Sequence, residues 1–175
     1  SLLEKILAER DLYHLNQEKE YISLQNTNYV FDVSLLEIFI PLALGGTLVI
    51  PNSHTIFDFD YLVDLLIKHQ ITDLQGTPSF FRNFVKSLTQ DQIQKVALKR
   101  LCIGGESLDQ ELVELLQTSF GNTLSINNHY GPSEITIDAL VKTNITEFSK
   151  NTIGRPMNNT TVYVVNKLGQ LNGVG

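Results

Sequence analysis

Apolar residues recur every three or four positions in several stretches of the chain, and this spacing predicts amphipathic helices of about ten residues. Gly45-Gly46 and Gly121-Asn122 are typical helix ends, and Pro78 suits the first turn of a helix. We expect Ser107 or Asp109 to cap the last helix. The predicted helices cover residues 1–10, 31–44, 61–69, 78–88 and 109–120.

Short runs rich in β-branched and apolar residues lie between these helices and predict strands. They cover residues 20–25, 47–50, 71–74, 101–103 and 123–127, and after the last helix residues 135–141 and 161–165. Strands that alternate with helices form βαβ units and a parallel sheet. The sequence therefore predicts a layered α/β fold, with a mostly parallel sheet flanked by helices.

The helix expected over residues 31–44 has a polar start and an apolar body. Leu35, Ile38, Phe39 and Leu42 fall on one helical face, which we expect to be buried. Asp32 or Ser34 is the expected N-cap, with Phe31 packed against the first turn as a staple.

The β-rich tail differs from the alternating part of the chain. We expect residues 1–150 to form an α/β subdomain and residues 151–175 to begin a different layer. The chain starts without Met and ends on GQLNGVG with no closing element, so we expect it to be a piece of a larger protein.

Composition narrows the function classes. Among 175 residues, 42% are hydrophobic and 18% are charged, which is a globular balance. The net charge of −6 argues against nucleic-acid binding, and no apolar run is long enough to span a membrane. The single cysteine, Cys102, excludes an internal disulfide, so we expect a reducing, cytoplasmic location and an inert, buried thiol.

Three segments follow predicted strands, where open α/β sheets bind ligands. Gln75-Gly76-Thr77-Pro78 and Gly104-Gly105-Glu106-Ser107 are each explained as well by a tight turn. The third, from Asn127 to Glu134 (NNHYGPSE), gathers an amide, an aromatic ring, a hydroxyl and a carboxylate in what we expect to be one loop. Such a set of groups can hold a base, a phosphate and Mg²⁺, so this segment favours a binding site.

The motifs resemble those of a known family when they are taken together. FDVSLLEIF at 31–39, GGE at 104–106, NNHYGPSE at 127–134 and IGRP at 153–156 match, in order, the pattern of adenylation domains of nonribosomal peptide synthetases. These domains belong to the adenylate-forming enzymes. The resemblance covers essentially the whole chain and implies a flavodoxin-like subdomain followed by the start of a β-barrel.

The resemblance implies an activity and an amino-acid pocket. Members of the family use ATP to convert an amino acid to an aminoacyl-adenylate and load it on the phosphopantetheine thiol of a carrier protein, beside neighbouring modules. Asp32 is implied to pair with the α-ammonium group. The implied pocket consists of Asp32, Val33, Leu36, Gln75, Cys102, Gly104, His129, Ile137 and Asp138. Three polar members, Gln75, His129 and Asp138, favour a polar or cationic substrate, although a small one such as glycine fits if these groups satisfy one another.

The nucleotide residues are implied in the same way. Gly105, Glu106 and Gly131 would frame the adenine slot, Tyr130 would lie against the ring, and Asn128 would bond its exocyclic amine. Ser133, where the family usually has Thr, would reach the α-phosphate, and Glu134 would hold Mg²⁺. Both are implied to act in catalysis.

Segments that the family also uses are absent from these 175 residues, namely its Lys-containing phosphate loop, its ribose-binding Asp segment and its C-terminal catalytic Lys. We therefore expect the chain alone to be inactive. Two other interpretations stay open: part of an acyl- or aryl-CoA ligase, and a non-catalytic α/β binding module. A nicotinamide site is disfavoured because no GxGxxG follows the first strand.

Overall fold

The protein is described by a computed structural model over residues 1–18, 20–52, 58–146 and 153–172. Within these residues one sheet of 7 strands has the order β2-β1-β3-β4-β5-β6-β7. Its parallel part consists of β1 (Ile22–Leu24), β2 (Thr47–Val49), β3 (Asp73–Gly76), β4 (Arg100–Gly104) and β5 (Ser125–Tyr130). Two antiparallel strands, β6 (Leu140–Lys142) and β7 (Arg155–Pro156), extend one edge. The predicted layered α/β fold is confirmed, and the order of the parallel strands is the flavodoxin-like one.

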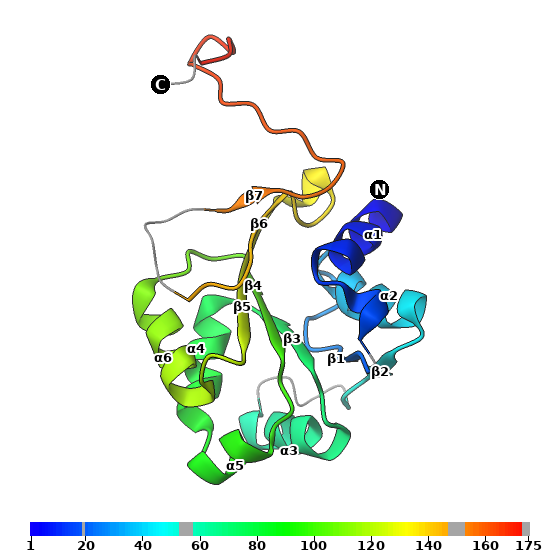
Figure 1. Ribbon diagram of the computed structural model, residues 1–175, viewed down its shortest axis with the longest axis vertical. Helices are drawn as coiled ribbons and strands as arrows, with labels where there is room; N and C mark the ends of the chain where they lie inside the picture. The colour runs from blue at the N-terminus through cyan, green and yellow to red at the C-terminus, as the bar shows by residue number, and fades with distance from the viewer. Residues whose placement is uncertain (19, 53–57, 147–152, 173–175) are drawn as a thin grey trace.

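Helices cover both faces of the sheet (Figure 1). On one face lie α1 (Leu2–Leu12) and α2 (Ser34–Leu44), joined by the short 3₁₀ helix η1 (Leu15–Gln17) and β1. The other face carries α3 (Phe59–His69), α4 (Pro78–Ser87), α5 (Gln90–Lys95) and α6 (Gln110–Phe120). None of the helices in the described ranges is long and apolar enough to cross a membrane.

Alternation along the strands divides the core into two parts. Leu74, Leu101, Ile103 and Ile126 point to the face covered by α3, α4 and α6 and belong to the larger apolar cluster. The opposite face supports a smaller cluster that α1 and α2 share, with Ile6, Tyr21, Leu36, Ile40 and Ile137. The residues that alternate with these four along β3, β4 and β5 therefore face α1 and α2.

Most helix limits follow local chemistry. The Asp109 side chain accepts a hydrogen bond from Leu112 N at 2.9 Å and caps α6, while Gly45 ends α2 in the left-handed conformation with a φ of 71°. The sequence analysis missed α5, although Thr89 and Gln92 form a capping box at its start.

The expected start of α2 is wrong. Its N-cap is Val33, and neither Asp32 nor Ser34 caps it through the side chain. Tight backbone turns satisfy the first N–H groups instead, with Leu35 N bonded to the carbonyl of Asp32 at 3.0 Å. Phe31 is 63% exposed and does not act as a staple.

The buried face of α2 also differs from the expected one. Leu36, Glu37 and Ile40 are buried, whereas Phe39 and Leu42 are exposed. The buried carboxylate of Glu37 explains the difference, because polar bonds to the preceding loop, rather than apolar spacing alone, set the rotation of the helix.

The segment after α6 is rearranged relative to expectation. Asn127–Tyr130 belong to β5 rather than to a loop, because β4 and β6 pair with this strand on both sides. The predicted strand over 135–141 is wrong for most of its length. A 3₁₀ helix, η2 (Ser133–Ile135), comes first, Thr136 and Ile137 have φ values of 68° and 66°, and β6 begins only at Leu140.

The predicted strand over 161–165 is also wrong. These residues are largely exposed and make one isolated bridge, between Val165 and Leu171. Figure 1 shows this segment extending away from the sheet, and no strand of the described residues pairs with it there. The proposed boundary near residue 150 falls outside the described residues, and the start of a β-barrel stays a prediction.

Candidate functional site

The carboxyl ends of β1 and β3 mark the point where the sheet changes direction. β1 leads to α2 on one face, whereas β3 leads to α4 on the other, so the two connections diverge. Open α/β sheets typically bind their ligands at such a divergence. The side-chain amide of Asn26, after β1, donates to the carbonyl of Gln75 on β3 at 3.1 Å. This bond links the two loops that border the divergence.

Asp32 lies in the turn that enters α2, at this same edge of the sheet. It is half-buried, and among the described residues its carboxylate has no hydrogen-bond or ion-pair partner. Since Asp32 does not cap α2, its charge is available to a ligand.

A buried carboxylate fixes the loop that carries Asp32. Glu37 is fully buried and accepts hydrogen bonds from Asn26 N at 3.1 Å, Thr27 N at 2.9 Å and Thr27 Oγ1 at 2.7 Å. Burial raises the pKa of Glu37 to about 7, against the opposing effect of these bonds. The first turns of α2 and the end of β1 are thereby held together.

The strand register brings the central residues of the expected amino-acid pocket together. Gln75 pairs with Cys102 across β3 and β4, and Gly104 pairs with His129 across β4 and β5. These residues alternate with the inward apolar positions, so they share the face covered by α1 and α2. A Cβ on Gly104 would lie 2.9 Å from the carbonyl oxygen of His129, so glycine is required there. Cys102 is only partly buried, in contrast to the expectation.

The apolar members of the expected pocket meet in the smaller cluster. Leu36 and Ile137 are buried in it, and Val33 packs against it. Residues from α2 and from the segment before β6, about a hundred positions apart in the sequence, thus line one region.

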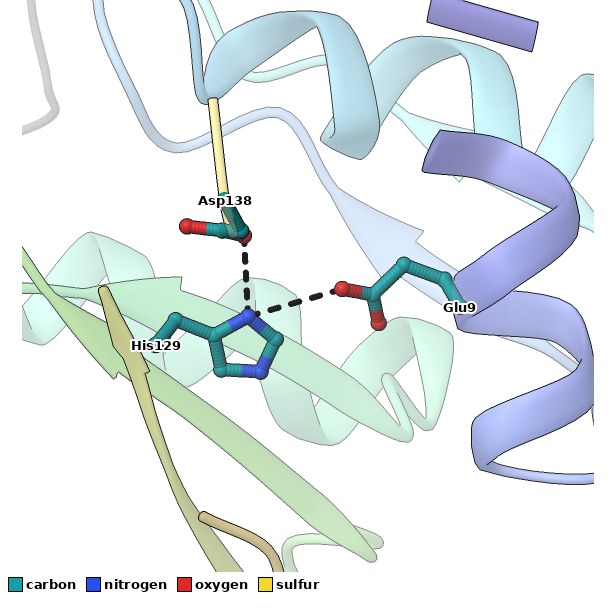
Figure 2. Close-up of side chains that lie close together, drawn as sticks. All are labelled: Glu9, His129 and Asp138. Atoms are coloured by element: carbon teal, nitrogen blue, oxygen red, sulfur yellow. Dashed lines mark hydrogen bonds and ion pairs between the residues drawn. The ribbon is translucent and has the colours of Figure 1, made fainter. Parts of the chain in front are cut away.

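His129 and Asp138 form a buried polar cluster with Glu9 of α1 (Figure 2). The Nδ1 atom of His129 lies 2.9 Å from Oδ2 of Asp138 and 3.4 Å from Oε1 of Glu9. The exposed fractions of Glu9, His129 and Asp138 are 3%, 7% and 7%. The structure therefore adds Glu9 to two residues that the sequence had singled out.

Charges in this cluster shift its pKa values. Burial would lower the pKa of His129, but interactions with Cys102, Glu9 and Asp138 raise it well above its usual value. Burial raises the pKa of the Cys102 thiol and keeps it neutral. Burial also raises the pKa of Glu9 to about 7.

Tyr13 connects this cluster to a second group of buried charges. Its hydroxyl lies 2.8 Å from Nε2 of His129, and the guanidinium carbon of Arg100 lies 4.9 Å from the centre of its ring. Arg100 in turn donates to Asp73 at 2.5 Å and to Glu18 at 2.8 Å. These contacts tie the end of α1 to β3, β4 and β5.

The expected adenine residues lie on the opposite face of β5 from His129. Asn128 and Tyr130 follow Ile126 at intervals of two, so they continue the side that faces α4 and α6, beyond the buried core. Tyr130 is 48% exposed. Gly105, directly after β4, has a φ of 80°. Oε2 of Glu106 accepts hydrogen bonds from Ser79 N at 3.1 Å and Ser79 Oγ at 2.6 Å. Glu106 thus fixes the start of α4.

The remaining expected residues follow β5. A Cβ on Gly131 would lie 2.0 Å from the carbonyl oxygen of Ile137, so the close approach of two backbone segments explains this glycine. Ser133 and Glu134 lie on η2 with exposed side chains. An exposed carboxylate is a hard oxygen ligand of the kind that Mg²⁺ prefers, and an exposed hydroxyl can donate a hydrogen bond to a phosphate oxygen.

Sequence reasoning missed Glu9, Tyr13 and Arg100. A signal was present for the first two, because Leu2, Ile6, Glu9 and Tyr13 fall on one helical stripe that otherwise packs in the smaller cluster. A carboxylate on such a stripe must find a polar partner. Arg100, the first residue of β4, follows the exposed Lys99, and the sequence gives no comparable signal for its burial.

Comparison with known proteins identifies the family. The model of the AMP-binding enzyme family matches residues 3–175. The chain belongs to this family. Its relatives include a linear gramicidin synthase of Brevibacillus parabrevis, which is 34% identical in an alignment of 178 positions. The alignment covers 100% of this chain and 3% of that protein. Gramicidin S synthase 2 of Aneurinibacillus migulanus is 31% identical over 87% of this chain and 3% of that protein.

Solved structures of nonribosomal peptide synthetases share the fold. A protein with adenylation and PCP domains, bound to a vinylsulfonamide inhibitor, matches with a TM-score of 0.76 and 26% identity over 89% of this chain and 27% of that one. The synthetase FmoA3 matches in fold, with a TM-score of 0.81 and 19% identity, over 95% of this chain and 18% of that one. The AMP-binding chain therefore spans a small part of each of these relatives, and the predicted resemblance to synthetase adenylation domains is confirmed.

Proposed function

We propose that this AMP-binding chain forms the amino-acid pocket and part of the ATP site of a protein that activates an amino acid as its aminoacyl-adenylate. The free carboxylate of Asp32 carries the proposal. It lies at the divergence of β1 and β3, has no partner among the described residues, and is held in place through Glu37. An unpaired carboxylate suits an α-ammonium group, with which it forms a charge-assisted hydrogen bond.

The side chain of the amino acid is proposed to lie between α2 and the sheet. Val33, Leu36 and Ile137 supply apolar contacts, and Gln75, Cys102 and Gly104 line the strand side. Deeper groups, His129 and Asp138, are polar and buried beside Glu9. These polar groups support a polar or cationic substrate over an aliphatic one.

ATP is proposed to bind on the other side of β5. The exposed ring of Tyr130 offers a stacking surface, Asn128 offers an amide for the base edge, and Gly105, Glu106 and Gly131 form the neighbouring backbone. Ser133 is proposed to bond the α-phosphate and Glu134 to hold Mg²⁺, which would neutralise phosphate charge when bound. Both side chains are exposed, as these roles require.

A carrier protein is the proposed acceptor of the activated amino acid. The support is that one structural relative contains both adenylation and PCP domains. In this view the thiol of the carrier's phosphopantetheine attacks the acyl carbon of the adenylate, forms a thioester and releases AMP.

The test uses the parent protein, which is the natural polypeptide that contains this chain. The exchange of pyrophosphate into ATP is measured with each amino acid of a panel. We expect one polar or cationic amino acid to dominate. Asp32→Asn should lower kcat/KM for that amino acid about 10- to 100-fold, as loss of a charged hydrogen bond does. The exposed Asp11→Asn serves as the matched control.

Two results would contradict the proposal. Activation of a fatty or aryl acid that is unaffected by Asp32→Asn would identify an acyl- or aryl-CoA ligase. Absence of exchange with every acid would indicate a non-catalytic binding module. We also propose that the 175-residue chain alone gives no exchange, because the Lys-containing segments of the family are not among its residues.

A further inference from the structure

The cluster of Glu9, His129 and Asp138 has the dimensions of a metal site. One ligand atom from each residue lies within 4.8 Å of the ligand atoms of the other two. Ligand atoms of a tetrahedral Zn²⁺ ion with bonds of about 2.0–2.1 Å are separated by about 3.3 Å. The distances from Nδ1, 2.9 Å to Asp138 and 3.4 Å to Glu9, lie on either side of this value.

The hydrogen bonds of the cluster are incomplete without a further cation. Nδ1 can carry only one hydrogen, yet two carboxylates approach it. Oε1 of Glu9 is buried and accepts no hydrogen bond from the described residues. A buried carboxylate oxygen without a hydrogen bond is costly, so this atom can accept a cation.

A divalent ion also balances the charge of the cluster. Two ionised carboxylates, a neutral imidazole and a divalent cation sum to zero. Since uncompensated charge is strongly disfavoured at buried positions, such an ion allows both carboxylates to be ionised there.

The contact that Nε2 of His129 makes is compatible with metal binding at Nδ1 of the same ring. Nε2 lies 2.8 Å from the hydroxyl of Tyr13, to which it can donate its hydrogen when Nδ1 is a ligand. Metal-binding histidines typically donate their second N–H to such a partner, which fixes the tautomer. Tyr13 follows directly on α1, which carries Glu9, so this one segment supplies both the ligand and the support for His129.

We propose that Glu9, His129 and Asp138 bind one divalent transition-metal ion, preferentially Zn²⁺, through Oε1, Nδ1 and Oδ2. Mixed nitrogen and oxygen donors suit Zn²⁺, and a fourth position stays open for water or a substrate group. The ion joins α1, β5 and the segment before β6. The site shares two residues with the proposed amino-acid pocket but does not depend on that function, since it needs neither ATP nor an amino acid.

The test is titration of the chelator-treated parent protein with Co²⁺ alone, followed by displacement with Zn²⁺. We expect one equivalent of Co²⁺ with the intense visible absorption of a four-coordinate ion, lost when Zn²⁺ is added. Glu9→Gln and Asp138→Asn should each weaken binding at least about 100-fold, because even groups behind the ligands are worth 10- to 100-fold. Glu4→Gln, at an exposed glutamate of the same helix, is the matched control.

Three outcomes would overturn the proposal. One is the absence of stoichiometric Co²⁺ binding by the folded wild-type protein. A second is binding that persists unchanged in the Glu9→Gln/Asp138→Asn double variant. The third is an NMR signature of a doubly protonated His129 ring in the presence of excess Zn²⁺. These measurements need no catalytic activity, so failure of the metal site and failure of the adenylation proposal are distinguishable. Circular dichroism of each variant separates lost binding from lost folding.

Discussion

The carbonyl oxygen of Ile137 lies over Gly131, only 2.0 Å from the position that a Cβ would occupy. The chain leaves β5 at residue 131, turns through η2 and returns with Ile137 buried beside α2. Glycine at 131 is therefore a packing requirement, and this contact places Ile137 and Asp138.

Gly131→Ala should destabilise the protein, because backbone atoms of residues 137 and 138 must move. We expect a loss of about 2–4 kcal/mol in the free energy of unfolding, measured by urea denaturation. Gly105→Ala is the matched comparison, since Gly105 has a φ of 80° but its nearest neighbour would be 3.7 Å away. It should cost only about 1 kcal/mol from backbone strain. Equal losses in the two variants would show that crowding at 131 is unimportant.

Glu37 should make stability depend on pH. Its pKa rises from 4.5 to about 7 on folding, so the folded state holds a proton that the unfolded state releases in this range. The stabilisation is complete below pH 4.5 and is lost as the pH rises to about 7. By linkage this loss amounts to about 3 kcal/mol.

Glu37→Gln should remove this dependence. Its amide oxygen can accept the two backbone hydrogen bonds, while its NH₂ group can donate to a rotated Thr27 hydroxyl. Urea midpoints at pH 5 and pH 8 should therefore converge in the variant relative to wild type. The exposed Glu4→Gln should leave the wild-type difference in place. A variant with an unchanged pH profile would show that Glu37 titrates normally.

Arg100 should be critical to folding. It is buried and bonded to Asp73 and Glu18, so Arg100→Met leaves buried carboxylates without their cation. We expect a loss of about 3–5 kcal/mol in unfolding free energy. The neighbouring Lys99→Met removes an exposed cation that lies 3.8 Å from Glu18 and should cost less than about 1 kcal/mol. A loss below about 1 kcal/mol for Arg100→Met would contradict the importance of this network.

Tyr130 should act through its ring rather than its hydroxyl. Tyr130→Ala should raise the KM for ATP in the parent protein about 5- to 150-fold, which corresponds to about 1–3 kcal/mol for one stacked base. Tyr130→Phe should leave it unchanged. Tyr163→Ala, at an exposed tyrosine of the C-terminal segment, is the control. An unaltered KM in Tyr130→Ala would mean that the adenine does not stack on this ring.

Sequence patterns were informative where local rules and packing agree. The spacing of apolar residues located α1, α3, α4 and α6, and Gly45 ended α2 as expected, because each depends on neighbours within a few positions. Strands β3 and β5 were placed two or three residues early. Their ends are set by pairing with distant strands, which no local pattern encodes.

The errors near the site have a similar origin. The β-branched run at 161–165 has the propensity of a strand but no strand beside it within the described residues. The rotation of α2 is set by the bonds that Glu37 makes to Thr27. The position of Glu9 matters only because His129 and Asp138 come to it from elsewhere in the fold. Motif matching found His129 and Asp138 but not the helix that completes their surroundings.

Strand β5 carries Asn128, His129 and Tyr130 on alternating sides, with the central residue facing α1 and its two neighbours facing the other way. Single substitutions along this strand can thus change what one side recognises while leaving the other intact. An insertion or deletion of one residue before Asn127 would exchange the contents of both sides at once. Natural variation in the length of this strand should accordingly be rarer than variation in its side chains. On the proposed assignment of the two sides, new substrate preferences can thus be acquired here without loss of nucleotide binding.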